Sequence, residues 1–114
     1  MSDISMNEYQ RQADTTAIYP NKGEIGGLMY AALGLTGEAG EVANKVKKVL
    51  RDDNGELTDE KRVAILKEVG GVQWYVAALC TELRTHLGCV AEGNLGILAD
   101  RAERGVLTGS GDER

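Results

Sequence analysis

Three glutamates, carried by two segments that the sequence predicts to be helical, have the types and spacing to hold a metal ion. Glu38 and Glu41 are three residues apart, so on a helix their side chains project from neighbouring points of one face. Glu68 has a matching position on the next long segment. Three carboxylates that meet repel one another unless a cation lies between them, and a set of oxygen ligands suits Mg²⁺ or Mn²⁺. Magnesium completes its octahedron with water and phosphate oxygens, so the three acids predict a substrate with a phosphate ester or anhydride.

A simpler interpretation is that these acids are solvated and paired with Lys45 and Lys67, because acids at helical spacing are common on helix surfaces. The glycines of the same two segments favour the metal site, since each costs up to about 1 kcal/mol relative to alanine inside a helix. Glycine is retained where a backbone or a ligand approaches closely. The glycines concerned are Gly34, Gly37, Gly40, Gly70 and Gly71. They form no known phosphate-binding loop, because GxGxxG and GxxxxGK[ST] are both absent.

Hydrophobic periodicity places the acids on two long helices. Apolar residues recur at spacings of three and four over residues 28–50, and again from about residue 59 to residue 86. The polar stretch between them contains the turn signal Asn54-Gly55, and Thr58, Asp59 and Glu60 are typical of a helix start. The residues predicted to be buried are Leu35, Ala39, Val42, Val46 and Val49 on the first helix, and Ile65, Val69, Val72, Val76, Leu79 and Leu83 on the second.

Two shorter helices are predicted outside this pair. One covers residues 4–18 and ends before a loop that contains Pro20, the single proline. The other covers residues 90–104, with its apolar side formed by Val90, Leu95, Leu98 and Ala102, and Gly88 is expected to end the helix before it.

We therefore predict one all-α domain over residues 1–114, with an N-terminal helix and loop at 1–27 and a polar tail at 105–114. The two long helices should pack antiparallel, with the outer helices completing a four-helix bundle. Because the apolar stripes are wide for so small a chain, we also expect a homodimer or larger homo-oligomer.

Composition narrows the classes of function. Among 114 residues, 42% are hydrophobic and 27% are charged, which is typical of a globular protein, and the net charge of −5 disfavours a nucleic acid polymer as partner. No run approaches the roughly 18 apolar residues of a membrane helix, so we expect no membrane contact and a cytoplasmic location. Cys80 and Cys89 are expected to be free thiols, and His86, the single histidine, a surface residue at a helix end.

The sequence resembles the MazG-like nucleoside triphosphate pyrophosphohydrolases in two motifs. They are LGLTGEAGEVANKVKK at residues 33–48 and KEVGGVQWYVAAL at residues 67–79. That family carries an ExxE pair on one helix and an ExxD pair on the next. Glu38 and Glu41 match the first pair and Glu68 matches the glutamate of the second. The stretch at residues 93–114 is also similar to the family's C-terminal segment, as in the related dimeric dUTP pyrophosphatases and phosphoribosyl-ATP pyrophosphohydrolases.

The resemblance implies cleavage of a nucleoside triphosphate between its α and β phosphates, in a site shared between subunits of a helical dimer or tetramer. It assigns Glu38, Glu41 and Glu68 to Mg²⁺, for which Mn²⁺ could substitute, with Glu38 also orienting or deprotonating the attacking water. The remaining substrate-binding residues that it implies are Lys45, Lys48, Asn94, Arg101 and Arg104. Trp74 is expected to serve packing rather than base stacking.

The sequence departs from the family at two positions. Gly71 stands where ExxD has its aspartate, and Ile97 stands where relatives often carry a lysine. The alternative hypothesis is therefore a weakly active or silent member of the same fold that binds nucleotides or serves as an interaction module.

Overall fold

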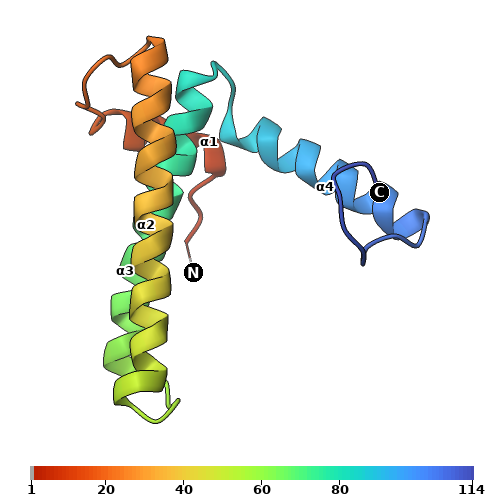
Figure 1. Cartoon of the computed structure of the whole chain (residues 1–114). Helices are drawn as coiled ribbons and strands as arrows, with labels where there is room; N and C mark the ends of the chain where they lie inside the picture. The colour runs from red at the N-terminus through yellow and green to blue at the C-terminus, as the bar shows by residue number, and fades with distance from the viewer. Residues whose placement is uncertain (1) are drawn as a thin grey trace.

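The structure, a computed structural model, describes residues 2–114, and these form four helices without any strand (Figure 1). The helices are α1 (Met6–Asp14), α2 (Ile25–Asp52), α3 (Asp59–Glu82) and α4 (Leu87–Glu103). The predicted all-helical class is confirmed. Both long helices are where the apolar periodicity placed them.

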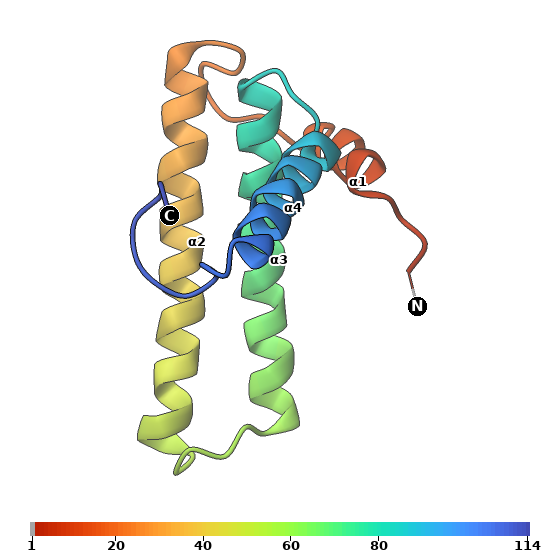
Figure 2. The same cartoon turned by 90° about the vertical axis from the view of Figure 1, so that its right-hand side faces the viewer.

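The long helices α2 and α3 pack side by side as an antiparallel hairpin (Figures 1 and 2). Asn54 and Gly55 both adopt positive φ angles in the connecting turn, a conformation that asparagine and glycine tolerate well. The α3 N-terminus is capped as expected, because the Thr58 hydroxyl accepts a hydrogen bond from the Lys61 backbone N–H at 3.1 Å. The position and the turn of the hairpin therefore follow from local sequence.

Small residues let the first half of α2 and the second half of α3 approach closely. Ala31 is completely buried, and a Cβ added to Gly34 would overlap the ring of Tyr75. Ala78 is buried on the opposite helix. Gly34 is thus retained because an aromatic ring of α3 occupies the space of its missing side chain.

A buried glutamine joins α1 to the turn between α3 and α4. The Gln10 side-chain amide donates to the Thr81 hydroxyl at 3.2 Å and to the Thr85 carbonyl at 2.9 Å, and its oxygen accepts from the Leu87 backbone N–H at 2.7 Å. Asn7 accepts from the Gly88 N–H at 2.8 Å. Because these N–H groups belong to the first turn of α4, α1 caps α4 in place of a local capping residue.

Several predicted helix boundaries were wrong. α1 covers only Met6–Asp14, since Ser5 caps its start and the chain turns after it. α3 ends at Glu82 because Arg84 adopts a left-handed φ of 58°, and Gly88 does not end it but lies in the first turn of α4. The start of α1 and the end of α3 are set by a local cap and a local turn, and the start of α4 is set by contacts with α1; periodicity shows none of these.

The four helices do not close into a bundle within one chain. α4 contacts α3 and α1 and then projects away from the hairpin (Figure 1). The predicted core was therefore partly wrong, because several of its residues are exposed when the chain is alone. These are Ala39, Val46, Val69, Leu83, Val90, Leu95, Leu98 and Ala102.

By length and composition alone, α3 is apolar enough to cross a membrane, because an 18-residue window within it has a mean hydropathy of 1.3. The core helix of a soluble protein has the same composition, and α3 packs against both α1 and α2. The cytoplasmic location stays a prediction.

Candidate metal and phosphate site

Glu38 of α2 and Glu68 of α3 meet across the middle of the hairpin. A hydrogen bond between their side chains raises the pKa of Glu38, and partial burial and the negative charges of Glu68 and Glu41 raise it further. Lys45 lies beside them, with its Nζ 3.5 Å from a Glu68 carboxylate oxygen. The hairpin thus brings two carboxyl groups close together, with one lysine beside them.

Gly71 lies directly against this pair. A Cβ built at Gly71 would be 2.7 Å from Oε2 of Glu38 and 3.0 Å from its carboxyl carbon. The neighbouring Gly70 has nothing within 4 Å of such a Cβ. The position at which the sequence departs from the family motif therefore faces the two acids, and the Glu38 carboxylate occupies the space that a side chain would take.

Glu41 lies at the edge of the site, whereas Lys48 lies nearer the end of α2. Glu41 is exposed, and its negative charge raises the pKa of Glu38. The pKa of Asp52 is lowered mainly by a hydrogen bond from Arg51, and the charges of Lys61 and the half-buried Lys48 add to this effect. Within residues 2–114, no three side chains of His, Cys, Asp or Glu come together in a metal-binding group. The structure thus brings together two of the three acids expected to bind metal and leaves the third adjacent.

The residues expected from α4 do not reach this site in the same chain. Asn94 is exposed, and the two arginines contact the C-terminal tail. Arg101 donates to the Asp112 carbonyl at 3.4 Å, and Arg104 donates to the Asp100 carboxylate at 2.9 Å and to the Arg114 carbonyl at 2.8 Å. Because α4 makes no contact with α2, these side chains are separated from Glu38.

A cluster of four aromatic residues lies on one side of the hairpin, next to the acids. Tyr19 stacks on Tyr30 with ring centroids 5.1 Å apart, and it contacts Trp74 edge-on. Trp74 packs in turn against Tyr75 and donates a hydrogen bond from its indole N–H to Thr16 at 2.9 Å. Burial raises the pKa of Tyr75, and a hydrogen bond to Tyr30 and the charge of Glu38 add to this effect. The sequence indicated packing for Trp74 but did not indicate this cluster, because Tyr19 and Tyr30 come from different segments.

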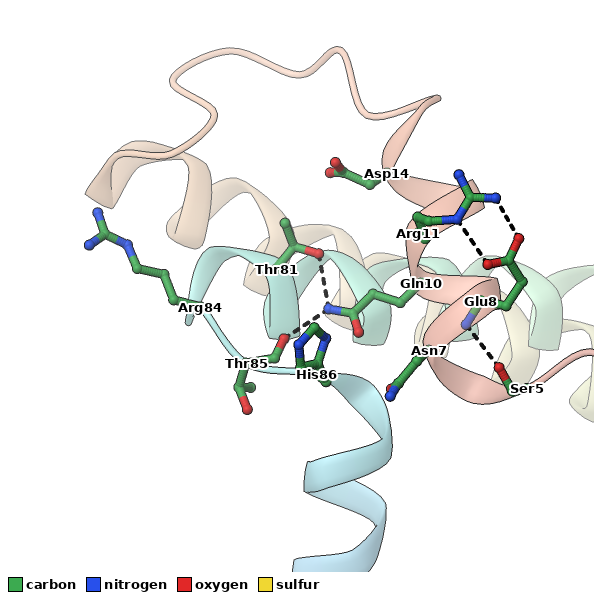
Figure 3. A pocket seen from close by; sticks show the side chains of 10 residues that line it. All are labelled: Ser5, Asn7, Glu8, Gln10, Arg11, Asp14, Thr81, Arg84, Thr85 and His86. Atoms are coloured by element: carbon green, nitrogen blue, oxygen red, sulfur yellow. Dashed lines mark hydrogen bonds and ion pairs between the residues drawn. The ribbon is translucent and has the colours of Figure 1, made fainter.

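Two cavities bear on the location of the candidate site. A cavity of about 530 Å³ lies beside Glu68 and is also lined by Lys45 and Lys67. Another, of about 600 Å³, lies between α1 and the turn from α3 to α4 (Figure 3). The second contains no residue expected from the sequence, and Glu8, Arg11 and Gln10 in it are already paired. The first cavity is therefore the one that adjoins the candidate site.

The chain is similar to the Gene 37 protein of Mycobacterium phage L5, with 51% identity over 109 residues that span 93% of this chain and 96% of that protein. No model of a known protein family matches the chain, and no solved structure matches it.

Proposed function

This chain belongs to the family of the Gene 37 protein of Mycobacterium phage L5, and we propose that it hydrolyses nucleoside triphosphates to monophosphates and pyrophosphate with Mg²⁺. The observation that carries the proposal is the pairing of Glu38 with Glu68 across the hairpin. Two neighbouring carboxyl groups disfavour each other's ionisation, and a divalent cation between them relieves this repulsion. The reaction itself, cleavage between the α and β phosphates, is proposed from the resemblance to the MazG-like motifs.

The carboxylate side chains at this site suit a hard cation such as Mg²⁺. Glu38 and Glu68 offer only oxygen ligands, and Glu41 adds negative charge at the edge. Mg²⁺ needs few protein ligands because water and phosphate oxygens complete its coordination. Bound there, it would neutralise charge on the phosphates. Mn²⁺ prefers the same ligands and should substitute for it.

Each side chain of the site has a role in the proposed hydrolysis. Glu38 orients or deprotonates the water that attacks the α phosphorus, because its carboxylate lies among the acids that would hold the metal. The bond from the α phosphorus to the bridging oxygen then breaks, and pyrophosphate leaves. Lys45 and Lys67 line the cavity beside Glu68, where they can neutralise phosphate charge, with Lys48 further along α2.

A second candidate is a weakly active or silent nucleotide-binding or interaction module of the same fold. Gly71 favours it, because this position faces the acids and offers no ligand. So does the lack of a three-residue metal group among residues 2–114.

Pyrophosphate release from a panel of deoxynucleoside and ribonucleoside triphosphates, with Mg²⁺ or Mn²⁺, separates the two candidates. We expect release that is lost with Glu68→Gln or Glu41→Gln, while Glu56→Gln, an exposed position in the turn, behaves like wild type. Binding without release from any nucleotide would favour the silent module. Activity within about threefold of wild type in Glu68→Gln would refute the assignment of that residue.

A further inference from the structure

A cavity of about 600 Å³ lies where α1, the end of α3 and the turn before α4 meet (Figure 3). Pockets of roughly 300–1,000 Å³ hold small-molecule ligands, so this space suffices for a small metabolite. Its walls share no residue with the cavity beside Glu68 and contain none of the residues that the sequence assigns to metal or phosphate. The charges and hydrogen-bonding groups of these walls determine what kind of ligand fits.

The acidic side chains in the walls are already neutralised. Glu8 pairs with Arg11, whose Nε donates to it at 2.8 Å, and hydrogen bonds from Arg11 are the main reason that the pKa of Glu8 falls to about 2. Asp14 pairs with Lys22, whose Nζ lies 2.7 Å from Oδ1 of the aspartate. Arg84 forms no ion pair within residues 2–114. With histidine counted as neutral, the walls thus carry one uncompensated positive charge, although the whole chain has a net charge of −5.

The walls also offer hydrogen-bond donors that have no partner in the part of the chain that the structure describes. The Asn7 side chain uses only its oxygen, which accepts from the Gly88 N–H, so its two amide N–H groups are free. The His86 imidazole, the Thr85 hydroxyl and the Arg84 guanidinium are free as well. Figure 3 shows that these groups come from both walls, Asn7 from α1 and the other three from the turn before α4. Free donors together with a positive charge attract an anion.

We propose that this cavity binds a small phosphorylated molecule, whose phosphate is held by Arg84, His86 and Asn7. A phosphate has three strong acceptor oxygens and uses more donors than a carboxylate does, and the cavity supplies them from separate side chains. The volume leaves room for an organic group attached to the phosphate. Backbone N–H groups at the start of α4 are not the binding groups, because those of Leu87 and Gly88 already donate to α1.

The backbone of Arg84 supports a role for its side chain. Its φ of 58° lies in the left-handed region, which is unfavourable for most residues with a Cβ. Glycine or asparagine would end α3 at this position with less strain. Strained residues cluster at functional sites, where the surrounding structure keeps them in place. Anion binding by the guanidinium explains why arginine stands at this turn.

A ligand in this cavity also contacts both segments that fix the start of α4. Gln10 of α1 already bonds to Thr85 and Leu87 on the other wall. A phosphate held from both sides adds to this link, so its binding should raise the melting temperature. The site thereby couples a small molecule to the attachment of α4, a property that goes beyond the proposed hydrolysis.

The test uses the full chain in the presence of EDTA, so that the hairpin acids hold no cation able to bind phosphate. His86 is the single histidine, so its ring protons report on this cavity in a proton NMR titration with inorganic phosphate. At constant pH and ionic strength, we expect these signals to shift with phosphate until they saturate. Acetate at equal concentration should shift them much less.

Two variants separate binding from folding. Asn7→Asp keeps the oxygen that accepts from the Gly88 N–H, and its negative charge suits the start of α4, so the variant should melt no lower than wild type. Because a carboxylate replaces the free amide, its affinity for phosphate should fall at least about tenfold. Arg84→Gln keeps the same backbone conformation and should also lose about tenfold. The matched controls, Asn44→Asp on α2 and Arg62→Gln on α3, change exposed positions and should bind phosphate like wild type.

Several outcomes would overturn the proposal. Signals of His86 that do not saturate with phosphate would do so, and so would wild-type affinity in Asn7→Asp or Arg84→Gln. Acetate bound as tightly as phosphate would refute phosphate as the ligand class. Equal losses in Asn7→Asp and Asn44→Asp would show that the net charge of the chain, rather than this cavity, controls binding.

One further variant keeps this inference separate from the proposed hydrolysis. Glu68→Gln should lose pyrophosphate release but bind phosphate at His86 like wild type. Loss of the phosphate-dependent shift in Glu68→Gln would place the anion at the hairpin and overturn the inference. Absence of hydrolysis in wild type would leave the phosphate titration unaffected, so the two proposals fail separately.

Discussion

The adjacent glycines Gly70 and Gly71 have different surroundings, and the difference makes the candidate site testable at one residue. We expect Gly71→Asp to bind Mg²⁺ or Mn²⁺ about tenfold more tightly than wild type, because it adds a third carboxylate beside Glu38 and Glu68. The rate of pyrophosphate release should rise together with the metal affinity. Without metal, the added negative charge should lower stability, and the change in helix propensity contributes only a few tenths of a kcal/mol.

Titration calorimetry with each metal measures this effect. Gly70→Asp is the control, because its side chain would enter open space on another side of α3. Equal metal affinities in the two variants would show that position 71 does not contribute to a metal site.

The raised pKa of Glu38 predicts how stability depends on pH. A carboxyl group whose pKa is higher in the folded state stabilises the fold while it is protonated, and this contribution is lost as pH rises through the raised value. Glu38→Gln is neutral at every pH. Without metal, the variant should therefore melt at a higher temperature than wild type at pH 8, with a difference that shrinks toward pH 4. Added Mg²⁺ should raise the melting temperature of wild type more than that of the variant. A difference that is independent of pH would contradict the Glu38–Glu68 interaction.

At the scale of helices, the packing of α2 on α3 depends on a glycine whose space is filled by an aromatic ring. Gly34→Ala should destabilise the fold by about 1–3 kcal/mol, because its Cβ would overlap the Tyr75 ring. Gly37→Ala, three residues further along the helix, adds a Cβ with nothing within 4 Å and should stabilise by about 0.5–1 kcal/mol through helix propensity. Urea denaturation of both variants checks the contrast. Equal effects would mean that α2 and α3 do not approach as closely as described.

At the scale of the whole molecule, an open hairpin with a projecting α4 should owe much of its stability to association. For a dimer that unfolds to single chains, each tenfold increase in protein concentration should raise the melting temperature by about 2–4 °C. Ala39→Glu, a charge among the exposed apolar residues of α2, should abolish this dependence. Calorimetry over a hundredfold range of concentration measures it, and a constant melting temperature for wild type would show that the hairpin is stable alone.

The sequence by itself determined the helical class, the two long helices, the turn at Asn54-Gly55 and the start of α3 at Thr58. Each depends on residues close together in the chain: apolar periodicity, a cap and two turn residues. The motif resemblance also predicted which acids form the candidate site.

Only the tertiary structure decided which of these residues meet. It placed Glu38 against Glu68 and Gly71 and kept Arg101 and Arg104 away from them. It also left apolar residues of both long helices exposed, Val46 and Val69 among them. Periodicity shows that a helix has an apolar face, but it does not show whether that face packs within the same chain. The direction of α4 depends on Gln10 and Asn7 of α1, far away in sequence. Contacts between distant segments are selected by packing and capping in three dimensions, so a single sequence does not reveal them.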